Sequence, residues 1–347
     1  MGEVSIRKKK TESDLRKADL SKVKLGRYPF RAGIKYYLAK REPFLNGDTP
    51  AEQERKLRQF ATMFEELIEK NMISTTDPRH LKESDIEEFL ILIKDNSVST
   101  QDSYVRVLNA YLLVFKNRVI LNMREDRQNK LPRPTNNKPI HSIPLADIEK
   151  LFDTADTMIG PGATMLRGYI ALALGTGARP KEIMSAELKD LDLKNRKFFV
   201  RNPKGNGSWA DPQWTPIIQN EMIPYLERFL KERESLVKGS RAESKYLFPN
   251  IGTGIPYSGN GFRRQKANLC KKSGVNFMLK DFRSTLATYL VNSGAPIQIV
   301  AYVLRHSQTR TTELFYAAAN KENLMKGIED ISNSCPIFNR EKTSDRQ

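Results

Sequence analysis

The sequence predicts a mainly α-helical protein with a small β-sheet, an α+β fold divided into two domains. Three observations predict it. Apolar residues recur at helical spacing along much of the chain, two short runs of strand-forming residues flank a loop at 202–213, and a polar, Pro-rich segment separates two sets of helices. With 347 residues, the chain is long enough for two domains.

The composition favours a polyanionic partner. A net charge of +17 with 39% hydrophobic residues suits a globular protein that binds nucleic acid, and an anionic membrane surface is a weaker candidate. No apolar run approaches the ~20 residues of a membrane span, and the charged N-terminus lacks a signal-peptide core. Two cysteines cannot form a disulfide framework, and three scattered histidines suggest no metal cluster. We therefore expect a cytoplasmic protein without metal, small-molecule cofactor or membrane partner.

Residues 1–43 predict a basic N-terminal arm, because they contain thirteen Lys or Arg against five acidic residues. A solvated tail explains such a run about equally well. Aromatic residues interleave with Arg31 and Lys35, which favours an arm that contacts DNA; they are Tyr28, Phe30, Tyr36 and Tyr37.

Residues 44–123 predict a small helical bundle. Helical spacing of apolar residues is clear over 60–67, over 86–90 after a candidate N-cap at Ser84, and over 99–115. Residues 124–143 are polar and contain several prolines, so they are expected to form an extended linker. Arg124 and Arg127 in this linker are candidate DNA contacts, although a plain spacer is equally consistent with the residues.

Residues 144–332 predict the second domain, and 333–347 a polar tail. Helices are expected over 145–154, 164–174, 223–236 and 262–270, and strands over 197–200 and 214–218. The helix over 262–270 has a basic face that could bind a DNA backbone or simply face solvent; its candidates are Arg263, Arg264 and Lys266.

The stretch 279–316 predicts a short helical hairpin. Apolar residues spaced four apart from Phe282 onwards form one buried face. Gly294 ends this helix and Pro296 opens the next, at a position that needs no backbone N–H. The second helix leaves Arg305 and His306 at its C-terminal end.

This stretch resembles the second half of the tyrosine recombinase (phage integrase) signature. The family pattern H-x-L-R-H-S-x-A-T, L-G-H-S and T-T-x-x-Y appears as KDFRSTLAT over 280–288, LRHS over 304–307 and TTELFY over 311–316. There are three departures: Lys280 replaces the usual histidine, Arg305 replaces the usual glycine, and Tyr316 comes one residue late. A lysine at the first place is found in some archaeal viral integrases, so the resemblance favours an archaeal virus or plasmid-type enzyme.

Three further segments resemble the same family. GTGARPKEI over 175–183 resembles its first box, G-x-R-x-x-E, with Arg179 left at a helix N-terminus where an anion is stabilised. NPKGNG over 202–207 gives Lys204 as the match to a mobile lysine in a β-hairpin. Residues 86–108 resemble its SAM-like core-binding domain. The resemblance therefore implies a two-domain DNA clamp, a helical core-binding domain joined to a catalytic domain.

The resemblance implies a site-specific DNA recombinase that cleaves and rejoins strands through a 3′-phosphotyrosyl link to Tyr316. The link conserves the phosphodiester energy, so a free 5′-hydroxyl can reverse the attack without metal or ATP. Arg179 and Arg283 would clamp the scissile phosphate, because guanidinium groups stay charged and bind phosphate oxygens in a bidentate manner.

The remaining catalytic candidates would assist this step. His306 would donate a hydrogen bond to a phosphate oxygen, Lys204 would protonate the leaving 5′-oxygen, and Glu182 would hold the Arg179 guanidinium. Lys280 as a protonated amine favours electrostatic stabilisation over removal of the tyrosine proton.

The resemblance also implies a homo-oligomer on double-stranded DNA, a tetramer on two sites, and the basic N-terminus favours a mobile-element integrase. Three alternatives stay open. A type IB topoisomerase shares the chemistry, a catalytically inactive DNA-binding protein of the same fold would explain Lys280 and the late tyrosine, and a basic helical RNA-binding protein is the weakest.

Overall fold

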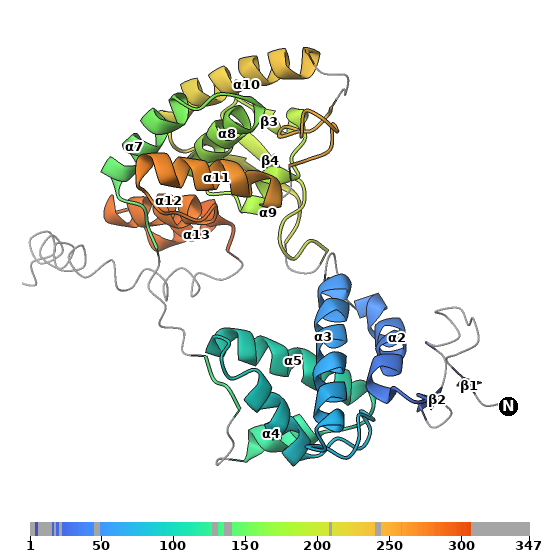
Figure 1. Ribbon diagram of the computed structural model, residues 1–347. Coiled ribbons are helices and arrows are strands. Elements are labelled where there is room, and N and C mark those ends of the chain that lie inside the picture. The colour runs from blue at the N-terminus through green and yellow to red at the C-terminus, as the bar shows by residue number, and fades with distance from the viewer. Residues whose placement is uncertain are drawn as a thin grey trace, which may run out of the picture. The chain divides into compact units, whose positions relative to one another are not determined.

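The computed structural model describes residues 4–5, 16, 19–20, 23–44, 49–126, 131–134, 141–207, 210–239, 244–257 and 259–306. The chain divides into two compact units, Met1–Lys138 (unit 1) and Pro139–Gln347 (unit 2), each with its own hydrophobic core (Figure 1). The mainly helical fold with a small sheet is as expected. In the part of the chain that the structure describes, no helix is long and apolar enough to cross a membrane.

Unit 1 is a helical bundle whose core is dominated by aromatic rings. Its regular elements are β1 (Val4–Ser5), β2 (Val23–Lys24), α2 (Pro29–Arg41), the 3-10 turn η2 (Glu42–Phe44), α3 (Thr49–Glu69), α4 (Glu83–Leu92), α5 (Val98–Val114) and α6 (Val119–Glu125). Phe64 stacks between Phe30 and Phe89, with ring centroids 5.0 and 5.4 Å away. The Tyr111 hydroxyl donates to the Phe30 carbonyl at 2.6 Å, so the core joins α2, α3, α4 and α5.

Two expectations for unit 1 need correction. Helix α2 belongs to the core: Phe30, Tyr36 and Tyr37 are buried, so these side chains do not form a DNA-contacting arm. The reason is that their spacing along a helix places them on one face, where burial of aromatic surface outweighs the neighbouring cations. Helix α4 begins at Glu83 with Lys82 as its N-cap rather than Ser84, because the Asp85 carboxylate accepts from the Lys82 amide at 2.8 Å.

The segment expected as a linker is attached to both cores within its described parts. Helix α6 extends to Glu125, and Leu131 is buried in unit 1. Ile143 is buried in unit 2, where its amide donates to the Thr285 hydroxyl at 2.9 Å. Each end of the segment is therefore fixed to its own unit.

Unit 2 is built around one buried helix. Its helices are α7 (Leu145–Asp156), α8 (Pro161–Thr176), α9 (Pro180–Met184), the 3-10 turn η3 (Leu188–Asp190), α10 (Met222–Lys238), α11 (Gly259–Ser273), α12 (Asp281–Asn292) and α13 (Ile297–Leu304). Helix α8 contacts α7, α9, α10, α11 and α12, and almost every one of its residues is buried. A helix whose surface is mostly apolar is stable only inside a core, and α8 is the central helix of unit 2, from which the site residues are placed (Figure 1).

A three-stranded antiparallel sheet lies beside these helices. Its strands are β3 (Leu191–Asp192), β4 (Lys197–Val200) and β5 (Gln213–Pro216), in that order. Phe198 faces Thr215 across β4 and β5, and both side chains are buried. The Ile218 amide, just after β5, donates to the Gly175 carbonyl at 2.7 Å, which fixes the sheet to the end of α8.

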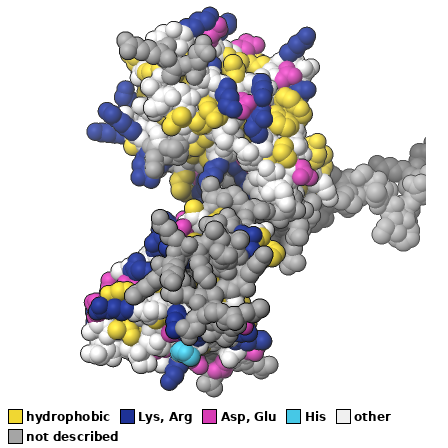
Figure 2. All heavy atoms as spheres, turned by 90° about the vertical axis from the view of Figure 1, so that its right-hand side faces the viewer, with side chains coloured by type: hydrophobic (Ala, Val, Ile, Leu, Met, Phe, Trp, Pro, Cys, Tyr) yellow, Lys and Arg dark blue, Asp and Glu magenta, His cyan; other side chains and the backbone are white. Residues whose placement is uncertain are grey.

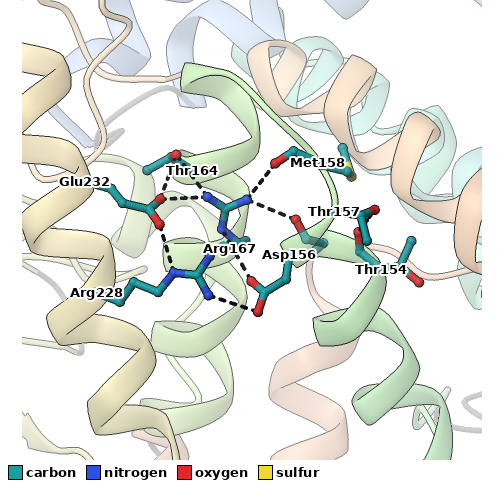
Figure 3. A network of polar contacts seen from close by, with 9 residues as sticks. Thr154, Asp156, Thr157, Met158, Thr164, Arg167, Arg228 and Glu232 are labelled. Carbon is teal, nitrogen blue, oxygen red and sulfur yellow. Dashed lines mark hydrogen bonds and ion pairs between the residues drawn. The ribbon is translucent and has the colours of Figure 1, made fainter.

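A polar network fastens α8 to its neighbours on the far side from its C-terminus (Figure 3). Arg167 on α8 donates to Glu232 on α10 at 2.7 Å and to the Ala155 carbonyl at the end of α7 at 3.0 Å. Arg228 on α10 bridges Glu232 and Asp156, at 2.9 Å each. Because two carboxylates alternate with two guanidinium groups, the network fixes the angles among the three helices.

We expect Gly168→Ala to destabilise unit 2, because a methyl group at this place on α8 would lie 2.4 Å from the Phe229 ring of α10. The expected loss is about 1–3 kcal/mol of unfolding free energy, despite the better helix propensity of alanine. Denaturant unfolding of purified protein measures it. Gly162→Ala on the same helix is the control, because its new methyl group meets only the flexible Gln265 side chain. Equal stability of the two variants would contradict the close packing.

Candidate active site

Arg179 is placed by a tight turn at the end of α8. Gly177 caps this helix in the left-handed region at φ 62°, and a side chain there would meet Leu286 and Leu304 at 3.2 and 3.1 Å. Arg179 then takes an extended conformation as the N-cap of α9, where Pro180 begins the helix. The turn brings the end of α8 against α12 and α13, so only glycine suits residue 177.

Arg283 comes from the first turn of α12 and reaches back to the same turn. Its Nη1 donates to the Gly177 carbonyl at 2.5 Å, and its Nη2 donates to the Leu304 carbonyl at the end of α13. Two backbone acceptors on different segments fix both the position and the plane of the guanidinium. Arg179 and Arg283, 104 positions apart in the sequence, are thus held at one turn.

Glu182 is the buried anion of the site. Its carboxylate accepts from the Arg179 amide at 2.8 Å, from Arg179 Nη1 at 2.9 Å and from Arg305 Nη2 at 2.7 Å. Burial alone would raise the pKa of this carboxyl, but Arg305 and Arg179 bring the pKa below its usual range. Glu182 therefore stays ionised and joins the two guanidinium groups.

His306 follows α13 directly and faces the same cations. Burial, together with the charges of Arg283, Arg179 and Arg305, lowers the pKa of its imidazole to about 4. At neutral pH the ring is uncharged, and it retains one N–H group that can donate a hydrogen bond. Three guanidinium charges thus lie near a neutral histidine, and one carboxylate pairs with two of them, which leaves two net positive charges to receive an anion.

The two candidate lysines are exposed. Lys204 lies on the loop between β4 and β5, which turns at Gly205 and Gly207, at φ 91° and 72°. Lys280 is the residue before α12, one turn from Arg283, and the carbonyl of the preceding Leu279 accepts from the α8 residue Tyr169 at 3.0 Å. Neither lysine has a side-chain partner among the described residues, so both amino groups can meet a ligand.

The other candidates lie elsewhere. Arg263 and Arg264 are exposed on α11, whereas Lys266 is half-buried with its Nζ 5.7 Å from the centre of the Phe277 ring. Arg124 is exposed at the end of α6 in unit 1. Arg127 and Tyr316 lie outside the described residues, as does everything after His306. Figure 2 shows Lys and Arg side chains spread over the visible face of each unit.

Sequence reasoning missed two contributors to the site. Arg305 was noted only as a departure from a motif, yet its buried guanidinium joins Glu182 to the Thr215 hydroxyl on β5, at 2.7 and 3.0 Å. The sequence-based candidates also omit Asp281, whose carboxylate accepts from the Met278 amide at 2.7 Å and lies 2.9 Å from His141 Nδ1. The sequence signal that indicates Arg305 is a large cation at the place where the family pattern has glycine, directly before the candidate His306. Within the described residues no group of His, Cys, Asp and Glu side chains could hold a metal ion.

We expect the free energy of unfolding to fall as the pH drops from 6.5 towards about 4, partly through His306. In this range the unfolded chain binds a proton at His306 and the folded chain does not, so acid favours unfolding. Urea unfolding of wild type and His306→Gln at about pH 7 and about pH 5 measures this. The variant should lose less stability than wild type between the two pH values. An unchanged difference between the two proteins would show that His306 is not held neutral by folding.

Comparisons with known proteins identify one family for this chain. The family model described as the phage integrase family matches residues 142–323, which is more than half of the chain. The tyrosine recombinase XerD of Listeria monocytogenes serotype 4b (strain F2365) is 24% identical over 276 residues, which are 78% of this chain and 88% of XerD.

Two solved structures show the same fold. The Tn1549 transposon integrase in complex with circular intermediate DNA has a TM-score of 0.63 at 20% identity, covering 86% of this chain and 99% of that one. The XerH site-specific recombinase bound to difH substrate has a TM-score of 0.59 at 16% identity, covering 90% and 85%. The family match, the relative and the cation cluster lead to one conclusion: the chain belongs to the phage integrase family and is a tyrosine-type site-specific recombinase, a DNA strand-transferring enzyme.

Proposed function

We propose that this recombinase cleaves and rejoins duplex DNA through a 3′-phosphotyrosyl intermediate at Tyr316, with Arg179, Arg283 and His306 as its phosphate-binding groups. The observation that carries the proposal is the convergence of these groups from three separate segments: a buried carboxylate holds Arg179, the Gly177 carbonyl holds Arg283, and the charges of both arginines act on His306. Such an arrangement costs desolvation energy and gains most when an anion occupies it.

The charge balance of the cluster suits the reaction. A phosphodiester brings one negative charge, and its non-bridging oxygens gain charge as the tyrosine oxygen attacks. The two net positive charges of the site therefore stabilise the transition state more than the bound substrate. Backbone acceptors fix the Arg283 guanidinium before DNA binds, so little reorganisation is needed during the reaction.

The neutral His306 and the two lysines have separate roles in the proposed reaction. His306 donates its N–H group to a phosphate oxygen without adding charge. Lys204, exposed on the loop between β4 and β5, protonates the leaving 5′-oxygen. Lys280 stabilises the phosphate electrostatically from the start of α12.

The assembly and the outer DNA contacts are also proposed. The Tn1549 transposon integrase, which shares the fold, was solved in complex with circular intermediate DNA, and this supports a DNA clamp with residues 44–123 and 144–332 as its two domains. The exposed Arg263 and Arg264, with Lys266, suit contacts to the DNA backbone, and so do Arg124 and Arg127. A homotetramer on two sites would pair the strands for exchange, as a mobile-element integrase requires.

Tyr316→Phe should abolish covalent attachment to DNA, because phenylalanine has no hydroxyl to attack the phosphate. Wild-type protein is incubated with nicked duplexes carrying candidate attachment sequences, without metal or ATP, and denaturing gels are read for a slow adduct. Tyr302→Phe is the matched control, since Tyr302 is an exposed tyrosine on α13 and should keep the adduct. An adduct that survives in Tyr316→Phe would assign the nucleophile elsewhere. No adduct on any tightly bound DNA would favour the inactive binding protein.

Lys204→Ala should slow cleavage of ordinary DNA by about 10²-fold or more, if Lys204 protonates the leaving oxygen. A substrate with sulfur at the bridging 5′-position should restore the rate to within roughly tenfold, because a thiolate leaves without a proton. Single-turnover cleavage of both substrates measures this. Lys194→Ala, an exposed lysine in the turn before β4, is the control. Equal slowing on both substrates would give Lys204 a binding role instead.

A further inference from the structure

Arg305 occupies a backbone position that most side chains avoid. It caps α13 in the left-handed region, at φ 52° and ψ 49°. The signature that this chain resembles usually has glycine here, and glycine adopts this conformation without strain. A non-glycine residue kept in this region is a strained element that the surrounding contacts must hold in place.

Burial of the Arg305 side chain also costs free energy of folding. It is only 6% exposed, and its guanidinium makes contacts to Glu182 and to Thr215. Its Nε–H group is buried without a partner among the described residues. Burial lowers the pKa of Arg305, whereas Glu182 opposes this change. A glycine would avoid the strain and the unpaired donor, so local stability does not account for the arginine.

The contacts of Arg305 connect the two halves of the site. On one side lies Glu182, which also holds both the amide and the guanidinium of Arg179. On the other lies Thr215 in the middle of β5, the strand that follows the Lys204 loop. Thr215 is buried and paired in register with Phe198, so a bond to its hydroxyl fixes the whole hairpin base.

We propose that Arg305 is a positioning residue for strand transfer, which locks the phosphate-binding Arg179 and the base of the Lys204 hairpin into one geometry. The inference rests on the proposed roles of Arg179 and Lys204. It adds that the clamp and the loop do not move independently, because one guanidinium spans Glu182 and Thr215. With glycine at this position, this side-chain bridge between the two parts would be absent.

His306 supplies a readout that needs no DNA. The charged groups that act on its ring are Arg283 from α12, Arg179 at the start of α9, and its neighbour Arg305, and Glu182 pairs with the last two. Removing Arg305 removes one cation and opens a space for water. Both changes favour the protonated ring, so the titration of His306 should move to higher pH.

The experiment compares three variants with one control. Arg305→Gly removes the bridge and relieves the backbone strain, Arg305→Lys keeps a positive charge, and Thr215→Val removes the acceptor on β5 with little change of shape. Arg196→Gly is the matched control, since Arg196 is an exposed arginine in the left-handed region, at φ 49°, in the turn before β4. Each protein is tested by single-turnover cleavage of nicked DNA, by DNA affinity, and by NMR titration of the His306 ring, assigned with His306→Gln.

Arg305→Gly should slow cleavage by about 10- to 100-fold with DNA affinity unchanged, since misplaced catalytic groups reduce the rate more than binding. Its His306 midpoint should rise by about one pH unit. Thr215→Val should slow cleavage while leaving the His306 midpoint near its wild-type value, and Arg305→Lys should retain the low midpoint. Arg196→Gly should resemble wild type in all three measurements.

The proposal is overturned if Arg305→Gly cleaves as fast as wild type and its His306 midpoint does not move. It is also overturned if Thr215→Val leaves the cleavage rate unchanged, because the bond from Arg305 to Thr215 would then have no effect on cleavage. If Arg305→Gly does not fold, Arg305→Lys and Thr215→Val decide by the same criteria. A raised His306 midpoint in Arg305→Gly without any wild-type adduct would support the positioning of the cluster while rejecting the proposed cleavage chemistry.

Discussion

The pairing of the buried Glu182 carboxylate with two guanidinium groups is the interaction on which the candidate site in unit 2 depends. Arg179, Arg305 and Arg283 carry like charges, and the packing of α8, α9, α12 and α13 brings them close together. One ionised carboxylate with three donors around it offsets part of their repulsion. Because its pKa is held below the usual range, the charge persists well into acid conditions.

The rest of unit 2 keeps that carboxylate dry and in place. Helix α8 is buried along almost its whole length, so its neighbours must cover it, and its C-terminal turn ends beside Glu182. At this turn Gly177 allows α12 and α13 to approach closely, and its carbonyl receives Arg283. At the opposite end of α8, the alternating charges of Arg167, Glu232 and Arg228 set the helix angles (Figure 3). Packing thus determines where the cations converge.

The sequence predicted the fold and the order of the helices because apolar periodicity is a local signal. It predicted the turn before Arg179 for the same reason, since glycine and proline mark such turns within a few residues. It failed for α2, where a basic composition concealed an aromatic face that packs on α3 and α5. It also missed β3, a strand of two residues, Leu191–Asp192, whose pairing partner decides its existence.

The candidate site shows the same limit more sharply. Motif spacing could nominate Arg179, Arg283 and His306, but not the contact between Arg305 and Thr215, which are 90 residues apart. A long-range bond of this kind depends on how α13 is placed relative to β5, and no local sequence pattern predicts that placement. The lowered pKa of His306 was equally invisible, because burial and charges from other segments cause it.

The central claim is that Glu182 and Arg305 depend on each other inside the core, and a double-mutant cycle tests it most directly. The unfolding free energies of Glu182→Gln, Arg305→Met and the double variant are measured against wild type in denaturant. Each single change should leave a buried group without its partner, so the double variant should lose about 1–3 kcal/mol less than the sum of the two. Losses that add within about 0.5 kcal/mol would contradict the account, because the carboxylate and the guanidinium would then be independent.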